Sequence, residues 1–281
     1  MTWEIVAIAL GLLVGLSLGA LGGGGSTLAV PILVFVAGLS AQDATTASLL
    51  VVGVAAAVGV VGHLRNGNVR LGTGLAFGAA GIVGSRLGLV VNRALDENML
   101  LLAFSALIVF VAVRMYRSVG SGSSPAEGSD VPVSDDAGGV GVVTRERVTA
   151  RPGIDLSAPA LAKLAGAATV VGLLTGLFGV GGGFAVVPAL TLLLGFPAKQ
   201  AIGTSLVVIA MNAAIALAMR VGEIGFDWAV VAPFLVTVTI GVLVGTRVAN
   251  DLDSDRLTRA FALMLGAVAV FTAASTLLGS S

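Results

Sequence analysis

Two runs of glycine, one of them followed by two hydroxyl residues, are the parts of this sequence best suited to bind a ligand. They are Gly22, Gly23, Gly24, Gly25, Ser26 and Thr27, and Gly179, Gly181, Gly182 and Gly183. A helix that starts at such a run leaves its first N–H groups unpaired beside the positive end of its dipole, and glycine lets a ligand come close to the backbone. We therefore predict an anion-binding site at both runs. The alternative is that these glycines only let helices pack closely, which is the role we assign to Gly15, Gly19, Gly84 and Gly88.

Small polar residues near these runs are further candidates to line the site. They are Ser48, Thr204, Ser205 and Asn212. A hydroxyl donates a hydrogen bond to an oxyanion without the cost of burying a cation. The alternative for the hydroxyls is helix capping or bonding to a carbonyl one turn earlier. For Asn212 the alternative is a bridge between two helices.

Ionisable residues are scarce, which limits other kinds of chemistry. Arg86 and Arg247 either attract an anion or reach toward the membrane surface, and His63 is interpreted as an interfacial residue. Ser40 and Asp43 have the spacing of a helix cap. With one histidine and no cysteine, we predict no catalytic site, no metal site, no cofactor and no enzymatic activity. Nothing in the sequence suggests nucleic acid as a partner.

The pattern around the glycines occurs twice, 157 positions apart. Without a gap, Gly15, Gly19, Gly22, Gly25 and Pro31 recur as Gly172, Gly176, Gly179, Gly182 and Pro188. The same offset places Ser48 on Ser205. The chain is therefore an internal duplication.

Composition places both copies in a membrane. Hydrophobic residues make up 57% of the chain and charged residues 11%, far from the averages of soluble proteins. Apolar stretches long enough to cross a bilayer occupy 3–21, 45–62, 71–91, 99–115, 160–177, 201–219, 228–249 and 257–278. We predict an all-α polytopic membrane protein of about eight transmembrane helices, as two homologous four-helix repeats.

The glycine runs, each followed by a proline, interrupt the first segment of each repeat. Pro31 and Pro188 make a continuous helix costly, and unwound backbone at membrane depth requires a surrounding cavity. We predict broken or re-entrant segments there. With four crossings per half, the repeats are parallel and related by an axis along the membrane normal. If 26–38 and 183–195 are full crossings, the repeats are inverted instead.

A polar stretch separates the two halves. Its composition of Gly, Ser, Pro, Asp, Glu and Arg cannot form a core. We predict a first transmembrane repeat at 1–117, a flexible hydrophilic linker at 118–157 and a second repeat at 158–281. A modest bias of basic residues predicts a multi-pass protein of the cell membrane with both termini and the linker in the cytoplasm.

The doubled motif resembles a known family. Gly-Leu-x-x-Gly-x-x-Gly-x-Gly-Gly followed by Val-Pro-x-Leu at 15–38, its copy at 172–195, and the Ala-x-x-x-Ser-Leu stretches at 44–49 and 201–206 are similar to the TauE/SafE sulfite exporter family, also described as the toluene sulfonate uptake permease family. The resemblance covers nearly the whole chain except the linker. It implies an inner-membrane permease for sulfur-containing anions such as sulfite, sulfonates, sulfoacetate and thiosulfate.

These observations favour a secondary transporter of small oxyanions that works by alternating access around the paired glycine breaks. Its expected partners are the oxyanion, protons or another coupling ion, the lipid bilayer and a possible second copy of the chain. An anion channel shares the same site but does not concentrate its substrate. A non-transporting partner in a membrane complex would use the glycines for packing alone.

Overall fold

A computed structural model of the chain describes residues 2–92, 97–120, 158–178, 183–220 and 227–279, which form helices and no strand. The first half contains α1 (Thr2–Leu21), the short 3-10 helix η1 (Gly23–Gly25), α2 (Ser26–Phe35), α3 (Ala41–Arg65), α4 (Leu71–Asn92) and α5 (Glu97–Gly120). The second half contains α6 (Ala158–Phe178), α7 (Gly183–Pro188), the π-helical turn η2 (Ala189–Leu193), α8 (Ala198–Ala218), α9 (Trp228–Asp251) and α10 (Ser254–Gly279).

The prediction of an all-α chain is confirmed for the described residues. Three segments among them are both long and apolar enough to span a membrane, namely Gln42–Arg65, Ala198–Ala218 and Trp228–Asp251. The count of eight spans stays a prediction, as do the domain boundaries. Residues 121–157 of the predicted linker lie outside the described residues, and α5 extends to Gly120.

The duplication is visible in local geometry. Gly38 and Gly195, which are 157 positions apart, both adopt a left-handed conformation, with φ of 71° and 67°. Just after each glycine, the backbone N–H of Leu39 donates to Leu33 at 3.1 Å and that of Phe196 donates to Leu190 at 2.9 Å. The same turn therefore ends the broken segment in both halves.

Side-chain caps start two of the long helices, α3 and α9. The Ser40 hydroxyl accepts from the backbone N–H of Asp43 at 3.1 Å, which confirms the predicted cap of α3. In the second half, the Asp227 carboxylate accepts from the N–H of Ala229 at 3.1 Å at the start of α9. Each cap satisfies an N–H that the first turn of a helix leaves unpaired.

Glycines let α1 pack on α9 and α4 pack on α6. A Cβ on Gly15 would overlap the carbonyl of Val238, and a Cβ on Gly88 would overlap the carbonyl of Leu173. This close approach confirms the packing role predicted for Gly15, Gly19, Gly84 and Gly88. Because α1 packs on the second half and α6 on the first, the two repeats exchange their first helices.

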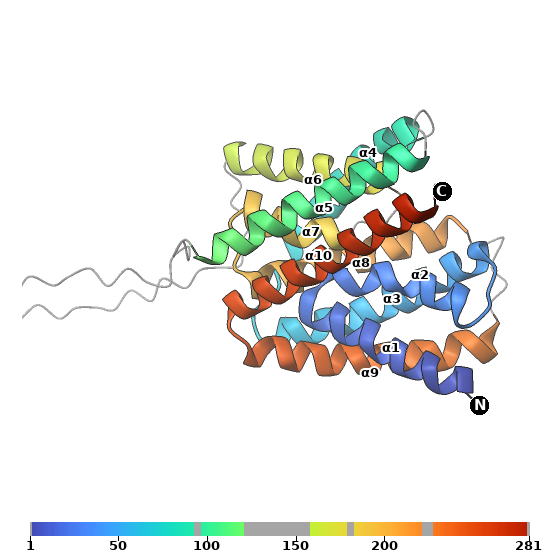
Figure 1. The fold of residues 1–281 in the computed structure, drawn as a ribbon. Helices are drawn as coiled ribbons and strands as arrows, with labels where there is room; N and C mark the ends of the chain where they lie inside the picture. Colours follow the sequence, from blue (N-terminus) through green and yellow to red (C-terminus); the bar gives the residue numbers. More distant parts are fainter. Residues whose placement is uncertain (1, 93–96, 121–157, 179–182, 221–226, 280–281) are drawn as a thin grey trace, which may run out of the picture.

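The two halves are inverted relative to each other. α3 and its counterpart α8 lie side by side, with Gly53 against Ala213 and Gly59 against Leu206, so the residue numbers run in opposite directions along the contact. The prediction of parallel repeats is therefore wrong. The physical reason is that α2 turns back toward the end of the bundle where α1 begins (Figure 1), which leaves three long helices, an odd number, to complete each half.

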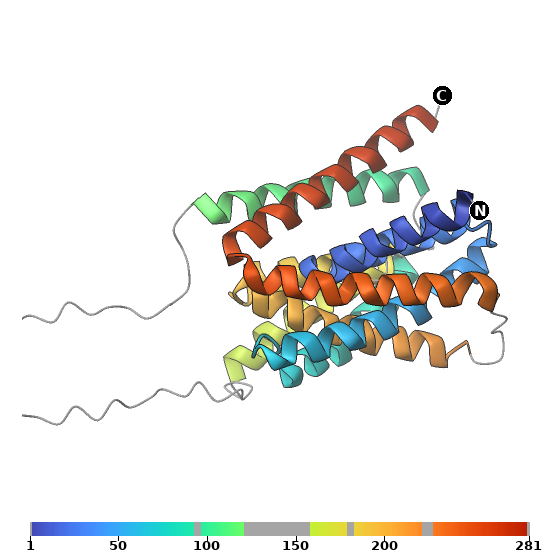
Figure 2. The same cartoon turned by 90° about the horizontal axis from the view of Figure 1, so that it is seen from below.

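This path separates the termini from the linker. α1 begins and α10 ends at one end of the bundle, which we call the termini end. α5 ends and α6 begins at the opposite end, which we call the linker end (Figures 1 and 2). The prediction that termini and linker share one face is wrong for these helix ends.

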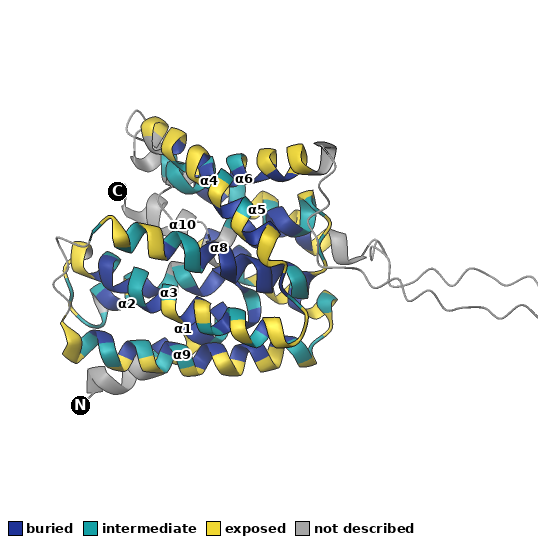
Figure 3. Cartoon of the chain, turned by 180° about the vertical axis from the view of Figure 1, so that it is seen from behind, coloured by how far each residue is buried: buried dark blue, intermediate teal, exposed yellow. Residues whose placement is uncertain are grey.

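The interior is built around α8. Residues 201–209 of this helix are all buried (Figure 3), and they contribute to both hydrophobic cores. α5 and α10 pack against each other on one side of the bundle (Figure 2).

Candidate functional site

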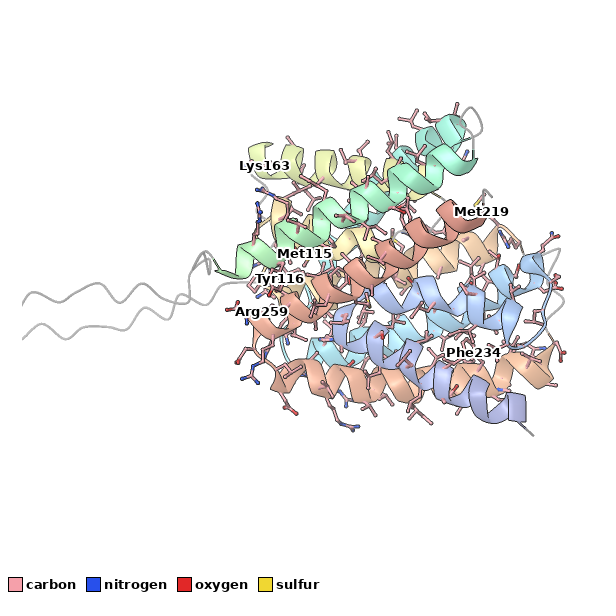
Figure 4. The ribbon with its side chains drawn as sticks, viewed as in Figure 1. Met115, Tyr116, Lys163, Met219, Phe234 and Arg259 are labelled. Carbon is pink, nitrogen blue, oxygen red and sulfur yellow. The ribbon has the colours of Figure 1, made fainter. Side chains whose placement is uncertain are left out.

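A cavity of about 660 Å³ lies between α2, α3, α4, α6 and α8. Its walls are the first half of α3, the second half of α4 and the second half of α8, which all lie toward the termini end. Met219, which is 72% exposed, lines it at that end (Figure 4). The polar lining residues are Ser26, Thr45, Ser48, Ser85, Arg86, Thr175, Asn212 and Arg220. This volume is within the range of about 300–1,000 Å³ that is typical of small-molecule pockets.

Three of the predicted site residues, Ser26, Ser48 and Asn212, meet in the wall of this cavity. The Ser26 hydroxyl donates to the carbonyl of Gly23 at 2.7 Å, and the Ser48 hydroxyl donates to the carbonyl of Thr45 at 2.8 Å. Each hydroxyl therefore bonds to a carbonyl one turn earlier. Rotation about one bond redirects the O–H to an oxyanion, at the cost of that bond.

Two arginines supply positive charge to the cavity. Arg220 follows the last turn of α8, and its guanidinium donates to the Thr46 hydroxyl at 2.8 Å. The Thr46 hydroxyl in turn donates to the carbonyl of Gln42 at 3.0 Å, so one hydroxyl orients the guanidinium over the cavity mouth. Arg86 on α4 is exposed at the same end. A guanidinium retains further N–H donors beyond a single bond, which suits a planar or tetrahedral oxyanion.

The glycines of the first run pack closely against neighbouring parts of the bundle. A Cβ on Gly23 would overlap the backbone of Gly183, one on Gly25 would overlap the Val14 carbonyl, and one on Gly24 would overlap the Met264 side chain. Gly22 has a φ of 78° and faces the Ser205 hydroxyl. Gly23 of the first run and Gly183 of the second therefore lie in direct contact. The packing role of Gly23, Gly24, Gly25 and Gly183 is clear, whereas anion binding by the N–H groups of the two runs stays a prediction.

The other predicted residues lie elsewhere. Ser205 is fully buried and donates to the carbonyl of Ile202 at 2.7 Å. Thr204, also fully buried, accepts from the backbone N–H of Arg70 at 3.2 Å. Thr27 belongs to α2, but its side chain lies outside the described residues, as do Gly179, Gly181 and Gly182.

The linker end is closed by polar contacts between the loop after α3 and the ends of α8 and α9. Arg70 donates to the Gln200 side chain at 3.1 Å and stacks on the Phe196 ring, with its guanidinium carbon 4.7 Å from the ring centroid. Lys199 donates to the carbonyl of Asn250 at 2.8 Å. The Asn68 amide donates to the Asn250 side chain at 3.1 Å. These bonds hold the three elements together away from the cavity.

His63 is buried rather than interfacial, which corrects its interpretation from the sequence. The imidazole is 0% exposed, and Nε2 lies 3.0 Å from the carbonyl oxygen of Gly19. Its Nδ1 has no hydrogen-bond partner among the described residues, and neither has the nearby hydroxyl of Thr246. His63 reaches this position because α1, which carries Gly19, packs beside the last turn of α3.

The sequence alone did not lead us to Arg220, Thr175 or Ser85 as candidate site residues. One signal could have revealed Arg220. At an offset of 157 residues it corresponds to His63, so both repeats have a basic side chain at the same position in an otherwise apolar segment. Thr175 and Ser85 have no such signal, because their counterparts are Leu18 and Val242.

Comparison with protein families gives one family over nearly the whole chain. The family model described as "Sulfite exporter TauE/SafE" matches residues 7–272. No solved structure matches the chain.

Individual relatives have names of the same kind. A protein of Xylella fastidiosa (strain Temecula1 / ATCC 700964) named "Probable membrane transporter protein" is 32% identical over 270 residues, which cover 95% of this chain and 94% of that protein. "Probable membrane transporter protein YunE" of Bacillus subtilis (strain 168) is 28% identical over 217 residues, which cover 74% of each chain.

Proposed function

Because the chain belongs to the TauE/SafE sulfite exporter family, we propose that it is a secondary transporter of small sulfur-containing oxyanions of the sulfite, sulfonate, sulfoacetate and thiosulfate class. The family makes the chain a membrane transporter. The substrate class, the coupling to protons and the transport cycle are our proposal.

The chemistry of the cavity supports an anionic substrate. Two guanidinium groups, Arg86 and Arg220, are its charged lining groups among the described residues, and no carboxylate accompanies them there. Hydroxyls and the Asn212 amide provide uncharged donors deeper inside. An oxyanion can therefore exchange its hydration shell for N–H and O–H donors without burying an unpaired charge.

One observation favours a carrier over a channel. The cavity extends toward the termini end only, while Arg70, Lys199 and their partners close the linker end. A site that is open on one side and sealed on the other is what alternating access requires, and inverted repeats provide two related conformations for it. An anion channel, the second candidate, needs a path open at both ends.

The charges of the helix ends favour a cytoplasmic linker end. The basic residues described at this end are Arg65, Arg70, Arg114, Arg117, Lys163, Lys199, Arg247, Arg256 and Arg259. At the termini end the described basic residues are Arg86 and Arg220. Figure 4 places Lys163 and Arg259 at the linker end and Met219 at the other. Since basic ends tend to stay in the cytoplasm, we propose that the linker end is cytoplasmic and that the cavity faces outward.

The test is uptake of labelled sulfite by proteoliposomes of the purified protein, with and without an imposed pH gradient and with a sulfonate competitor. Saturable accumulation that follows the gradient and is blocked by the sulfonate is expected for a proton-coupled carrier. Flux that only dissipates a sulfite gradient, without accumulation or counterflow, would identify a channel. Flux no faster than in empty liposomes for sulfite and for the other anions of the class would contradict the proposed substrate.

A further inference from the structure

The cavity has a second, closed version in the same molecule. Each lining residue has a counterpart 157 positions away in the other repeat. About half of these counterparts, including Val14, Leu18, Val51, Phe234, Val238 and Val242, belong to one buried hydrophobic core. We call these counterparts the counterpart core. Because the repeats are inverted, the counterparts of cavity residues near the termini end, such as Val242 and His63, lie toward the linker end.

Two polar groups sit in or beside this apolar core. Ser205, the counterpart of the cavity residue Ser48, is 0% exposed and packs against Gly22. His63, the counterpart of Arg220, is also 0% exposed, and its Nδ1 has no partner among the described residues. A buried polar atom without a partner is costly. A second conformation in which this imidazole nitrogen meets a partner would account for its retention.

We propose that the transporter has an oppositely facing state in which the linker end opens, and that Ser205 and His63 then line a cavity there in the positions that Ser48 and Arg220 occupy in this state. His63 would be the basic residue that meets the anion from the linker side. This inference rests on the proposed transport function. The oppositely facing state is obtained when each half adopts the conformation that the other half has in this structure.

The proposed second cavity differs from the first in its chemistry. Asn212 corresponds to Ala55, and Arg86 corresponds to Leu243. Among the described counterparts of the cavity-lining residues, His63 is therefore the one basic group of the proposed second cavity. The second cavity therefore binds the anion less tightly than the first. A lower affinity on the linker side suits release of the anion after inward transport, or loading from a high substrate concentration before export.

Cysteine accessibility tests the opening, because the natural chain has no cysteine. Ser48→Cys and Ser205→Cys form a matched pair, and each replaces a hydroxyl by a thiol of similar size. A charged, membrane-impermeant thiol reagent is applied to vesicles of the two opposite orientations. Ser48→Cys is expected to react from the termini side and Ser205→Cys from the linker side. Ser105→Cys, at a buried position on α5, is the control and should react from neither side.

Transport measured from each side tests His63. We expect His63→Gln to raise the KM for sulfite offered on the linker side by about tenfold, the loss of one charge-assisted bond, and to leave the KM from the termini side unchanged. Arg65→Gln, at an exposed position two residues away, is the control. An equal loss from both sides would mean that His63 is only structural.

The outcomes separate this inference from the proposed function. Thiol labelling needs no substrate, so it remains informative whichever anion is carried. If the unmodified chain transports sulfite but Ser205→Cys never reacts from the linker side, the second cavity is wrong and the transport function stands. If Ser205→Cys reacts as expected but no sulfur oxyanion is carried, the substrate is wrong and the alternating cavity stands.

Discussion

The cavity and the counterpart core come from the same repeated sequence, yet one is open and the other is closed. Part of the difference is volume. On α4 the cavity has Gly78 and Gly81, whereas the corresponding positions on α9 are Leu235 and Val238. Another part is electrostatic. Arg70 and Gln200 bond to each other at the closed linker end, while their counterparts at the termini end are Asp227 and Asp43.

Two carboxylates repel when brought together, whereas a guanidinium and an amide attract. Asp227 and Asp43 also already serve as parts of helix caps. Among the described residues, the termini end therefore has no equivalent of the bond between Arg70 and Gln200. An inverted duplication thus provides two similar half-bundles, and a few differences in sequence between them determine which one is closed in a given state.

The largest expected effect comes from the point where the halves touch. In Gly23→Val the new side chain meets the backbone of Gly183, which cannot rotate away. We expect a loss of stability of at least about 3 kcal/mol, at the upper end for overpacking, and loss of transport. Thermal unfolding in detergent measures the change. Gly166→Ala, where a Cβ meets nothing within 4 Å, should unfold at the same temperature as the natural protein or slightly above it. Equal Tm values for Gly23→Val and the natural chain would contradict the contact.

An intermediate effect is expected at the mouth of the cavity. Arg220→Gln removes the guanidinium that the Thr46 hydroxyl orients. The loss of one charge-assisted bond to an oxyanion corresponds to a decrease in kcat/KM for sulfite of about tenfold or more. Initial uptake rates over a range of sulfite concentrations measure it. Arg114→Gln, at an exposed position at the far end of the bundle, should transport normally. Unchanged uptake by Arg220→Gln would remove this residue from the site.

The smallest effect is expected at the linker end. Arg70→Ala removes the bond to Gln200 and the stacking on Phe196, and both contacts are partly exposed. A loss of about 1 kcal/mol corresponds to about a fivefold larger population of the state that is open at the linker end. The reaction rate of Ser205→Cys from the linker side should rise by this factor. Arg65→Ala should leave that rate unchanged. A rate independent of Arg70 would show that other contacts seal this end.

Much of the local structure follows from the sequence. The offset of 157 residues aligns Gly38 with Gly195, and these two glycines have almost equal φ values. The spacing of Gly15 and Gly19 predicted close packing, since a residue without a Cβ at every fourth position makes a groove for another backbone. Ser26, Ser48 and Asn212 were identified by their polarity in apolar surroundings, and they share one cavity wall.

The all-α class, the duplication and the family could thus be predicted from the sequence, because they depend on composition and on residues close along the chain. The inversion of the halves, the burial of His63, the place of Arg220 and the choice of which end is closed were revealed by the tertiary structure alone. A segment as short as α2 does not reveal from its length whether it crosses or turns back. Its direction depends on contacts with distant helices, and that direction decides on which side every later residue lies.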